Sequence, residues 1–178
     1  MGCRVITEAF QQSHDNVLGL VYVDGSLVGG RLETAIKRTK EAIDRVGIDA
    51  FTEKFFNDMF LDSSNPNLRQ RLVARAKSVD GGFREALFLD TIHWDVEKAK
   101  SALRQTTVPV LVLQSTYINS ELKRVPLQAG MMTPWIDAVA SLVAHSETKI
   151  VPGAGHFAMI EAAQDVNDEI EKFARHLA

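Results

Sequence analysis

The chain has 178 residues, of which 46% are hydrophobic and 24% are charged, and its formal net charge is −3 at pH 7. A chain of this length can form one domain with a sizeable core and a small appended part, and the composition is ordinary for a soluble globular protein. The weak negative charge provides no basic surface, so we expect no nucleic-acid partner.

The cysteine content and the hydropathy indicate the compartment. One cysteine, Cys3, excludes an internal disulfide framework and indicates a reducing environment. No apolar run reaches the length of a transmembrane helix, and no hydrophobic signal region follows Met1. We therefore predict a cytoplasmic protein without a membrane partner. The sequence contains neither a metal-ligand spacing nor a glycine-rich phosphate loop, so we expect no metal and no other cofactor.

The first two predicted elements are a helix and a buried strand. Residues 2–14 place their apolar side chains on one helical stripe, which predicts an amphipathic helix. Residues 17–23 then form an almost continuous apolar run, typical of a strand that is covered on both faces. The run ends at Asp24 and Gly25, a pair that is typical of a turn.

A long block without a convincing strand follows, from residue 31 to about residue 105. Its periodicity predicts five helical segments, at 33–46, at 48–61, from Pro66 to about 79, at 83–91 and at 95–105. Pro66 suits the first position of its helix, because proline lacks the N–H that a first helical turn leaves unused. The second segment is rich in phenylalanine, a stripe that more often forms simple core than a ligand site.

Two further strands complete the pattern. Residues 108–114 predict a second buried strand, which a long loop at 115–132 follows. Thr133 and Pro134 begin a helix as its N-cap and first residue. The third strand, at 148–151, leads toward a final amphipathic helix at the end of the chain.

The order of these elements predicts an α/β fold with three parallel strands flanked by helices. Strands that alternate with helices pair in parallel through right-handed crossovers. We place an α/β core at residues 1–30 and 106–178, and an inserted all-helical part at 31–105. Three strands are a small sheet for so many helices.

The third strand runs into Gly153-Ala154-Gly155-His156, a histidine that follows two closely spaced glycines. These glycines let the backbone turn sharply and leave the imidazole free to project from the strand end. Taken alone, the motif favours a surface histidine in a loop. The other four histidines lie at predicted helix ends or in the helical block, and we interpret them as surface or capping residues.

The element order and this motif together resemble the C-terminal half of an α/β-hydrolase. In that family the sixth strand often ends in aspartate-glycine, as residues 17–25 do. A helical lid is inserted next, in the position of residues 31–105. The seventh strand resembles residues 108–113, and the eighth leads to a histidine in a setting like that of His156, with an acidic residue soon after, here Glu161.

One part of the family pattern is missing from the sequence. The family's nucleophile is a serine in Gly-x-Ser-x-Gly, on a strained turn after the fifth strand. No such motif occurs in the 178 residues. Residues 2–14 match the helix just after that serine, so we expect the serine upstream of Met1. The first five strands and the oxyanion-hole segment would precede it.

The resemblance assigns His156 as the base of the catalytic triad and leaves the acid open. Most family members carry the acid a few residues past the seventh strand, a slot that Ile118 fills here. Some carry it at the end of the sixth strand, which is the position of Asp24. There it would accept a hydrogen bond from one imidazole nitrogen and fix the tautomer. Asp24 as a turn former is an equal alternative, and Glu121 is the second choice for the acid.

The resemblance implies a cofactor-independent hydrolase of ester, lactone or carbon–carbon bonds, acting through an acyl-enzyme on a small apolar acyl-type substrate. The alternative is a catalytically incomplete remnant that acts as a binding or assembly module, which the missing serine motif favours. Without a fifth strand beside it, the strand at 17–23 would present an unpaired edge. We expect that edge to pair with a second copy of the chain or with an N-terminal partner chain.

Overall fold

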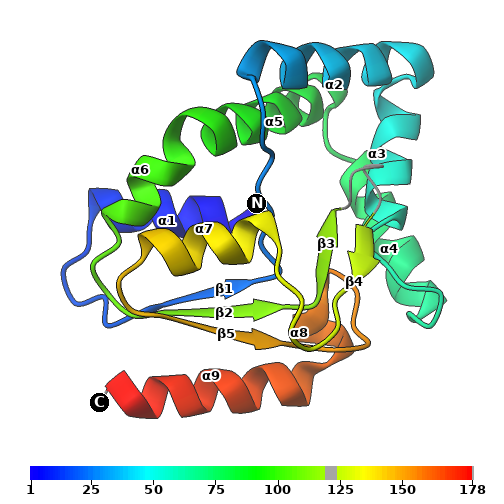
Figure 1. Ribbon diagram of the computed structural model, residues 1–178. Coiled ribbons are helices and arrows are strands. Elements are labelled where there is room, and N and C mark those ends of the chain that lie inside the picture. The colour runs from blue at the N-terminus through cyan, green and yellow to red at the C-terminus, as the bar shows by residue number, and fades with distance from the viewer. Residues whose placement is uncertain (119–123, 178) are drawn as a thin grey trace. The chain divides into compact units, whose positions relative to one another are not determined.

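The computed structural model describes residues 1–118 and 124–177, and the chain divides into two compact units (Figure 1). The first unit comprises Met1–Leu27 and Lys98–Ala178, and the second comprises Val28–Glu97. The first unit contains the sheet and every candidate site residue that the structure describes. The lid role of residues 31–105 stays a prediction.

The sheet of the first unit has three parallel strands, as predicted. They are β1 (Leu20–Val23), β2 (Val110–Gln114) and β5 (Ser146–Ile150), in the order β1-β2-β5. Leu20 pairs with Val110, and Val110 pairs with Ser146. The central strand is buried along its whole length, which explains why its first four residues, Val110 to Leu113, are all apolar.

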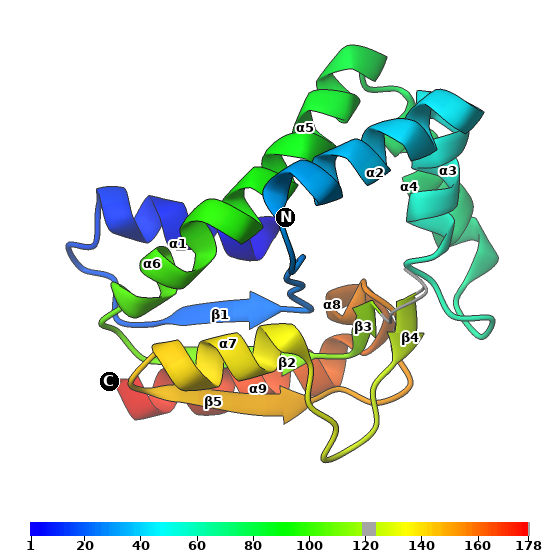
Figure 2. The ribbon, with the colours of Figure 1, turned by 45° about the horizontal axis from the view of Figure 1, so that its top comes forward.

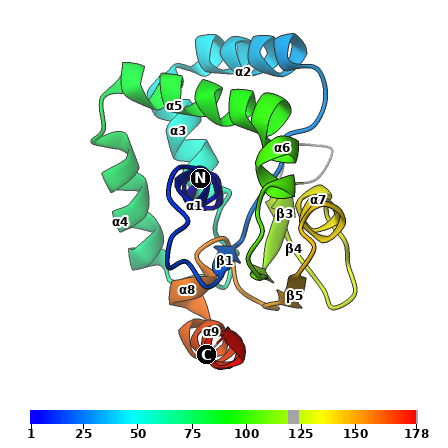
Figure 3. The ribbon, with the colours of Figure 1, turned by 90° about the vertical axis from the view of Figure 1, so that its left-hand side faces the viewer.

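Side chains of β2 point alternately to the two faces of the sheet, and each face has its own core. Val110 and Val112 pack on one face with Tyr22 and Trp135. The helices on that face are α1 (Gly2–Gln12), α6 (Ala99–Arg104) and α7 (Pro134–Leu142). Figures 1 and 3 show them on the same side of the strands.

The opposite face is covered from the C-terminal end of the chain. Leu111 and Leu113 of β2 pack there with Val151 and Val166. The elements on this face are α8 (Ala158–Glu161) and α9 (Ala163–Leu177), and Figure 3 shows α9 across the sheet from α1 and α7. The sheet is therefore a buried central layer with helices on both faces, which is the predicted α/β architecture.

The second unit is helical throughout. Its helices are α2 (Leu32–Val46), α3 (Ile48–Asn57), α4 (Pro66–Lys77) and α5 (Gly81–His93), and a π-helical turn, η1 (Trp94–Lys98), leads toward α6. Figure 2 shows α2 beside α5. Phe51 and Phe55 each contact the ring of Phe88 edge to face. The phenylalanine-rich stripe is thus occupied at these positions by packing within its own unit.

The segment after β2 differs from the prediction. Instead of a plain loop at 115–132, the structure has a short antiparallel hairpin of β3 (Thr116–Ile118) and β4 (Arg124–Pro126). Strands of three residues are too short to produce a recognisable alternation, so no periodic pattern predicts them. The hairpin brings Arg124 beside Thr116, directly after β2.

Candidate active site

Asp24 and His156 lie in contact, although 132 positions separate them in the sequence. Nδ1 of His156 is 2.6 Å from Oδ2 of Asp24. Asp24 follows β1 directly and His156 follows β5 by a short turn, so both lie at the carboxyl ends of parallel strands. Ser115 follows β2, which runs between those two strands. Ligands and catalytic groups in open α/β sheets gather at this edge.

The carboxylate of Asp24 is almost fully enclosed by hydrogen-bond donors. Oδ1 accepts from the backbone N–H of Ser115 at 2.9 Å, from its hydroxyl at 2.9 Å and from the backbone N–H of Thr116 at 2.7 Å. Oδ2 accepts from the Thr116 hydroxyl at 2.6 Å and from Nη1 of Arg124 at 2.9 Å. Apart from the contact with His156, these donors all follow β2. The carboxylate therefore ties three strand ends together, which a cap of the Asp24-Gly25 turn would not do.

The backbone at Asp24 has a conformation that few non-glycine residues adopt. Its φ is +48°, in the left-handed region where aspartate and asparagine are enriched. The next residue, Gly25, lies so close to the Trp135 indole that an added Cβ would be 2.1 Å from Nε1. The turn is thus fixed by packing, and it directs the carboxylate across the end of β2.

The surroundings of Asp24 keep it ionised. Burial alone would raise its pKa, but the hydrogen bond from His156, the charge of Arg124 and the Thr116 hydroxyl together hold the pKa below the ordinary value. An ionised carboxylate can only accept hydrogen bonds. Nδ1 of His156 must therefore carry the proton of this contact, which leaves Nε2 with its lone pair.

The imidazole itself is held in the neutral form. Burial lowers the pKa of His156, the hydrogen bond to Asp24 opposes this effect, and the positive charge of Arg124 adds to it. The net direction is downward from the ordinary value of 6.5. A neutral imidazole with a free Nε2 lone pair at pH 7 can accept a proton, so the pair has the geometry and charge state of a general base with its orienting acid.

The loop that carries His156 is attached on both sides of Gly155. The carbonyl of Gly155 accepts from the Ser115 hydroxyl at 2.8 Å, and its N–H donates to Oε2 of Glu161 at 3.0 Å. Gly153, at φ +75°, supplies the left-handed turn after β5. These contacts fix the direction in which the imidazole leaves the loop.

Sequence reasoning missed three residues of this site, namely Ser115, Thr116 and Arg124. None of them belongs to a motif. Ser115 lies directly after β2, and Thr116 and Arg124 belong to the hairpin that the sequence did not reveal. Glu121, the second choice for the acid, lies outside the described residues. Ile118 belongs to β3 and supplies no carboxylate.

Nε2 of His156 accepts no hydrogen bond from any described residue of its own unit. The hydroxyl of Ser115 has a single hydrogen, which is shared between Oδ1 of Asp24 at 2.9 Å and the Gly155 carbonyl oxygen at 2.8 Å. Across residues 1–118 and 124–177, no three side chains of His, Cys, Asp or Glu are grouped to hold a metal ion. In the same residues, none of the helices is both long and apolar enough to cross a membrane.

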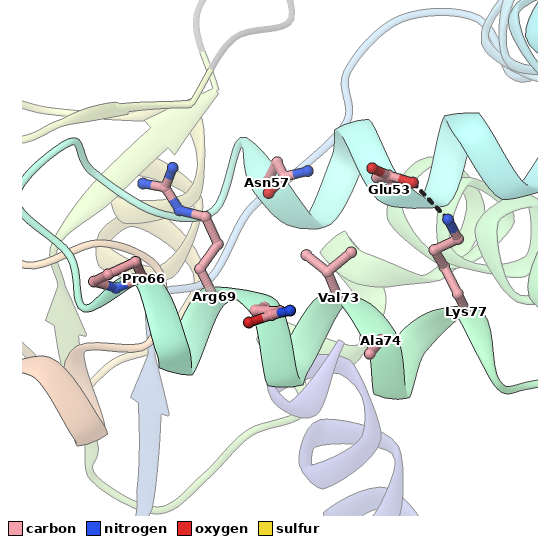
Figure 4. Close-up of a pocket in the computed structure, with 8 residues that line it drawn as sticks. Glu53, Asn57, Pro66, Arg69, Val73, Ala74 and Lys77 are labelled. Carbon is pink, nitrogen blue, oxygen red and sulfur yellow. Dashed lines mark hydrogen bonds and ion pairs between the residues drawn. The ribbon is translucent and has the colours of Figure 1, made fainter.

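The second unit has a surface hollow of its own. It has a volume of about 480 Å³ and lies between α3 and α4 (Figure 4). Nζ of Lys77 is 2.5 Å from Oε2 of Glu53 across it. None of the predicted site residues lines this hollow, so it contributes nothing to the pair described above.

No family model matches the sequence, and no curated protein matches it. Solved structures do match its fold. A thermophilic esterase from Thermogutta terrifontis has 18% identity and a TM-score of 0.68, over 98% of this chain and 61% of that one. A hydrolase from Oleispira antarctica has 14% identity and a TM-score of 0.70, over 96% and 61%. The epoxide hydrolase CorEH has 17% identity and a TM-score of 0.63, over 98% and 65%.

In each of these comparisons the chain is matched over nearly its whole length but spans less than two thirds of the structure that it resembles. The parallel sheet, the helices on both of its faces and the helical insertion after β1 all fall within the matched part. The chain therefore has the α/β-hydrolase fold.

Proposed function

We propose that the chain is the C-terminal part of a cofactor-independent hydrolase, in which His156 is the general base and Asp24 the acid of a Ser-His-Asp triad. The contact of 2.6 Å between Nδ1 and Oδ2, at the carboxyl ends of the strands, is the observation that carries the proposal. The substrates would be esters, lactones or compounds with a hydrolysable carbon–carbon bond, with a small apolar acyl group.

In this mechanism Nε2 of His156 takes the hydroxyl proton of a serine while the serine oxygen attacks the substrate carbonyl. Asp24 stabilises the imidazolium that forms, because its buried carboxylate already accepts the Nδ1 proton. The imidazolium then returns its proton to the leaving group and an acyl-enzyme remains. A water molecule, deprotonated by the same imidazole, hydrolyses the acyl-enzyme and restores the serine.

The serine must come from residues outside this sequence, because the 178 residues contain no Gly-x-Ser-x-Gly. The competing function, which the same absence favours, is a catalytically incomplete remnant that acts as a binding or assembly module. The two proposals differ in whether a segment with the nucleophile elbow accompanies this chain in the cell.

We place the protein in the cytoplasm, because its one cysteine, Cys3, is a free buried thiol.

The test begins with the reading frame immediately upstream of Met1. If it encodes a Gly-x-Ser, the extended polypeptide and the 178-residue chain are each treated with a fluorophosphonate probe, and their intact masses are measured. We expect a stoichiometric adduct on the upstream serine and none on the chain alone. The extended polypeptide should also hydrolyse short p-nitrophenyl esters, and His156→Gln should lower kcat by at least about 10³-fold.

The possible outcomes separate the proposals. A frame without Gly-x-Ser, or an extended polypeptide that neither reacts with the probe nor hydrolyses an ester, would favour the remnant. An adduct on a serine within residues 1–178 would show that the nucleophile has been misplaced. Full activity in the His156→Gln variant would exclude His156 as the base. The exposed His176→Gln variant is the matched control and should keep full activity.

We also propose that the free edge of β1 pairs with a strand of another polypeptide segment. Among the described residues, β1 pairs with β2 and has no strand on its other side. An exposed edge of this kind offers unpaired N–H and C=O groups to an incoming strand. A second copy of the chain would occupy the edge when the chain is isolated.

A further inference from the structure

Arg124 is a second ionic partner of the buried carboxylate. Nη1 of Arg124 lies 2.9 Å from Oδ2 of Asp24 and 2.7 Å from the Thr116 hydroxyl oxygen. The side chain of Arg124 is 6% exposed and that of Asp24 is 0% exposed, so the ion pair is shielded from solvent. The same oxygen of Asp24, Oδ2, is also in contact with Nδ1 of His156. A cation and an imidazole therefore share a single carboxylate oxygen.

This sharing has an electrostatic consequence. A buried carboxylate that faces an imidazole alone favours the imidazolium, because the positive ring is then the only charge that balances it. A fixed guanidinium on the same oxygen balances that charge permanently, since arginine stays protonated at any ordinary pH. The carboxylate keeps its geometric hold on Nδ1 but attracts a proton to the ring less strongly.

We propose that Arg124 is a positioning residue of the Asp24–His156 pair, holding the carboxylate ionised and in place while its charge opposes protonation of the imidazole. Its consequence for catalysis rests on the proposed function, whereas its effect on the two side chains does not. In the hydrolase, a base that resists protonation stays active at lower pH than an Asp–His pair without the guanidinium.

A purely structural role is the competing explanation. In that case the ion pair only anchors the β3–β4 hairpin to the sheet, and removing the charge of Arg124 does not change the protonation of His156. Besides Asp24 and Arg124, the amino terminus of the 178-residue chain opposes protonation of His156, and Glu161 accepts the N–H of the neighbouring Gly155. Neither group differs between the variants that are compared below.

The experiment measures the pKa of His156 by NMR titration of the imidazole C–H signals in the 178-residue chain. His156→Gln assigns the signal by its loss. Arg124→Gln removes the charge but keeps an N–H donor for Asp24 and Thr116, and Arg124→Lys keeps the charge. Arg104→Gln, at an exposed residue of α6, is the matched control.

We expect Arg124→Gln to raise the pKa of His156 by about one unit, as loss of a nearby positive charge requires. Arg124→Lys should leave the pKa within about 0.3 units of the parent, and Arg104→Gln should not change it. In a catalytically active extended polypeptide, the acidic limb of kcat/KM should move to higher pH by the same amount in Arg124→Gln.

An unchanged or lowered pKa of His156 in folded Arg124→Gln would overturn the proposal, and so would an equal rise in Arg124→Lys. Circular dichroism shows whether each variant is folded. If Arg124→Gln does not fold, Arg124→Met, which removes the charge from a side chain that is also long and unbranched, repeats the comparison with Arg124→Lys. A rise in pKa without any esterase activity would support the role of Arg124 and count against the proposed function.

Discussion

The fold holds His156 neutral and Asp24 ionised, and both charge states make the folded chain less stable in acid. The pKa of His156 is lowered in the fold, so the unfolded chain binds its proton more readily than the folded chain does. Stability is then full above the unfolded value of about 6.5 and falls as the pH drops toward the lowered folded pKa. The pKa of Asp24 is also lowered in the fold, so its contribution to stability is likewise lost as the pH falls. That loss occurs in stronger acid.

We therefore predict that the melting temperature decreases as the pH falls from 7 to 5. In His156→Gln the part of this decrease that begins near pH 6.5 should be missing, since glutamine does not titrate. His176→Gln, at an exposed position near the end of α9, should follow the parent curve. Differential scanning fluorimetry at half-unit pH steps measures all three. Parallel curves for the parent and His156→Gln would contradict the lowered pKa.

Gly25 is a second residue that the site depends on. An added Cβ would lie 2.1 Å from Nε1 of the buried Trp135, and the indole cannot move away without disturbing the core around it. We predict that Gly25→Ala lowers the free energy of unfolding by about 1–3 kcal/mol, the range typical of overpacked cores. Urea denaturation measures the loss. Gly2→Ala, with nothing within 4 Å of the added methyl, is the control and should be neutral or stabilising.

At the residue scale the sequence predicted the pair but not its surroundings. His156 and Asp24 could be named only through the resemblance to the α/β-hydrolases, since the motifs taken alone favour a surface histidine and a turn. Arg124 could not be named, since a single arginine after an irregular stretch can pair with any nearby carboxylate. Its partner is decided by the hairpin register, in which Arg124 lies opposite Ile118. That register leaves no periodic signal in three-residue strands.

At the element scale, the parts with long and regular patterns were predicted best. The three parallel strands and the helices starting at Pro66 and Pro134 are confirmed, because buried strands and proline-started helices have local causes. The strand at 17–23 begins three residues later than predicted, at Leu20. Gly19 precedes it, where an added Cβ would lie 2.7 Å from the Leu177 side chain. The close approach of Gly19 to α9 is therefore a feature of tertiary packing, which the local sequence does not reveal.

The short helix α8 has a part in holding the site. Its last residue, Glu161, accepts the N–H of Gly155, the residue before His156. A hydrogen bond to a charged acceptor is worth about 1.5–3 kcal/mol. We predict that Glu161→Ala speeds hydrogen exchange at the Gly155 amide by at least about tenfold, because the loop opens more often. Glu171→Ala, at an exposed residue of α9, should leave that amide unchanged. Equal exchange in the parent and Glu161→Ala would show that the contact does not restrain the loop.

At the scale of the whole molecule, the free edge of β1 is the feature that distinguishes this chain from a closed domain. Leu20 and Asp24 donate their N–H groups to the carbonyls of Pro109 and Leu113 on β2. In a parallel pair the intervening residues point their N–H and C=O groups the other way, so those of Val21 and Val23 face the edge on which no described residue forms a strand. This alternation identifies where a substitution can block an added strand without breaking the β1–β2 pairing.

Val21→Pro is such a substitution, because it removes an outward N–H and leaves the bonds of Leu20 and Asp24 to β2 in place. We predict that the isolated chain is a dimer or larger at micromolar concentration and that Val21→Pro shifts it toward the monomer. Val5→Ser, at a residue of α1 that is 59% exposed, controls for a general loss of apolar surface and should stay associated. Light scattering measures the mass, and circular dichroism checks the fold. A monomeric parent chain would show that the edge is tolerated in water, and the proposed strand pairing would then be wrong.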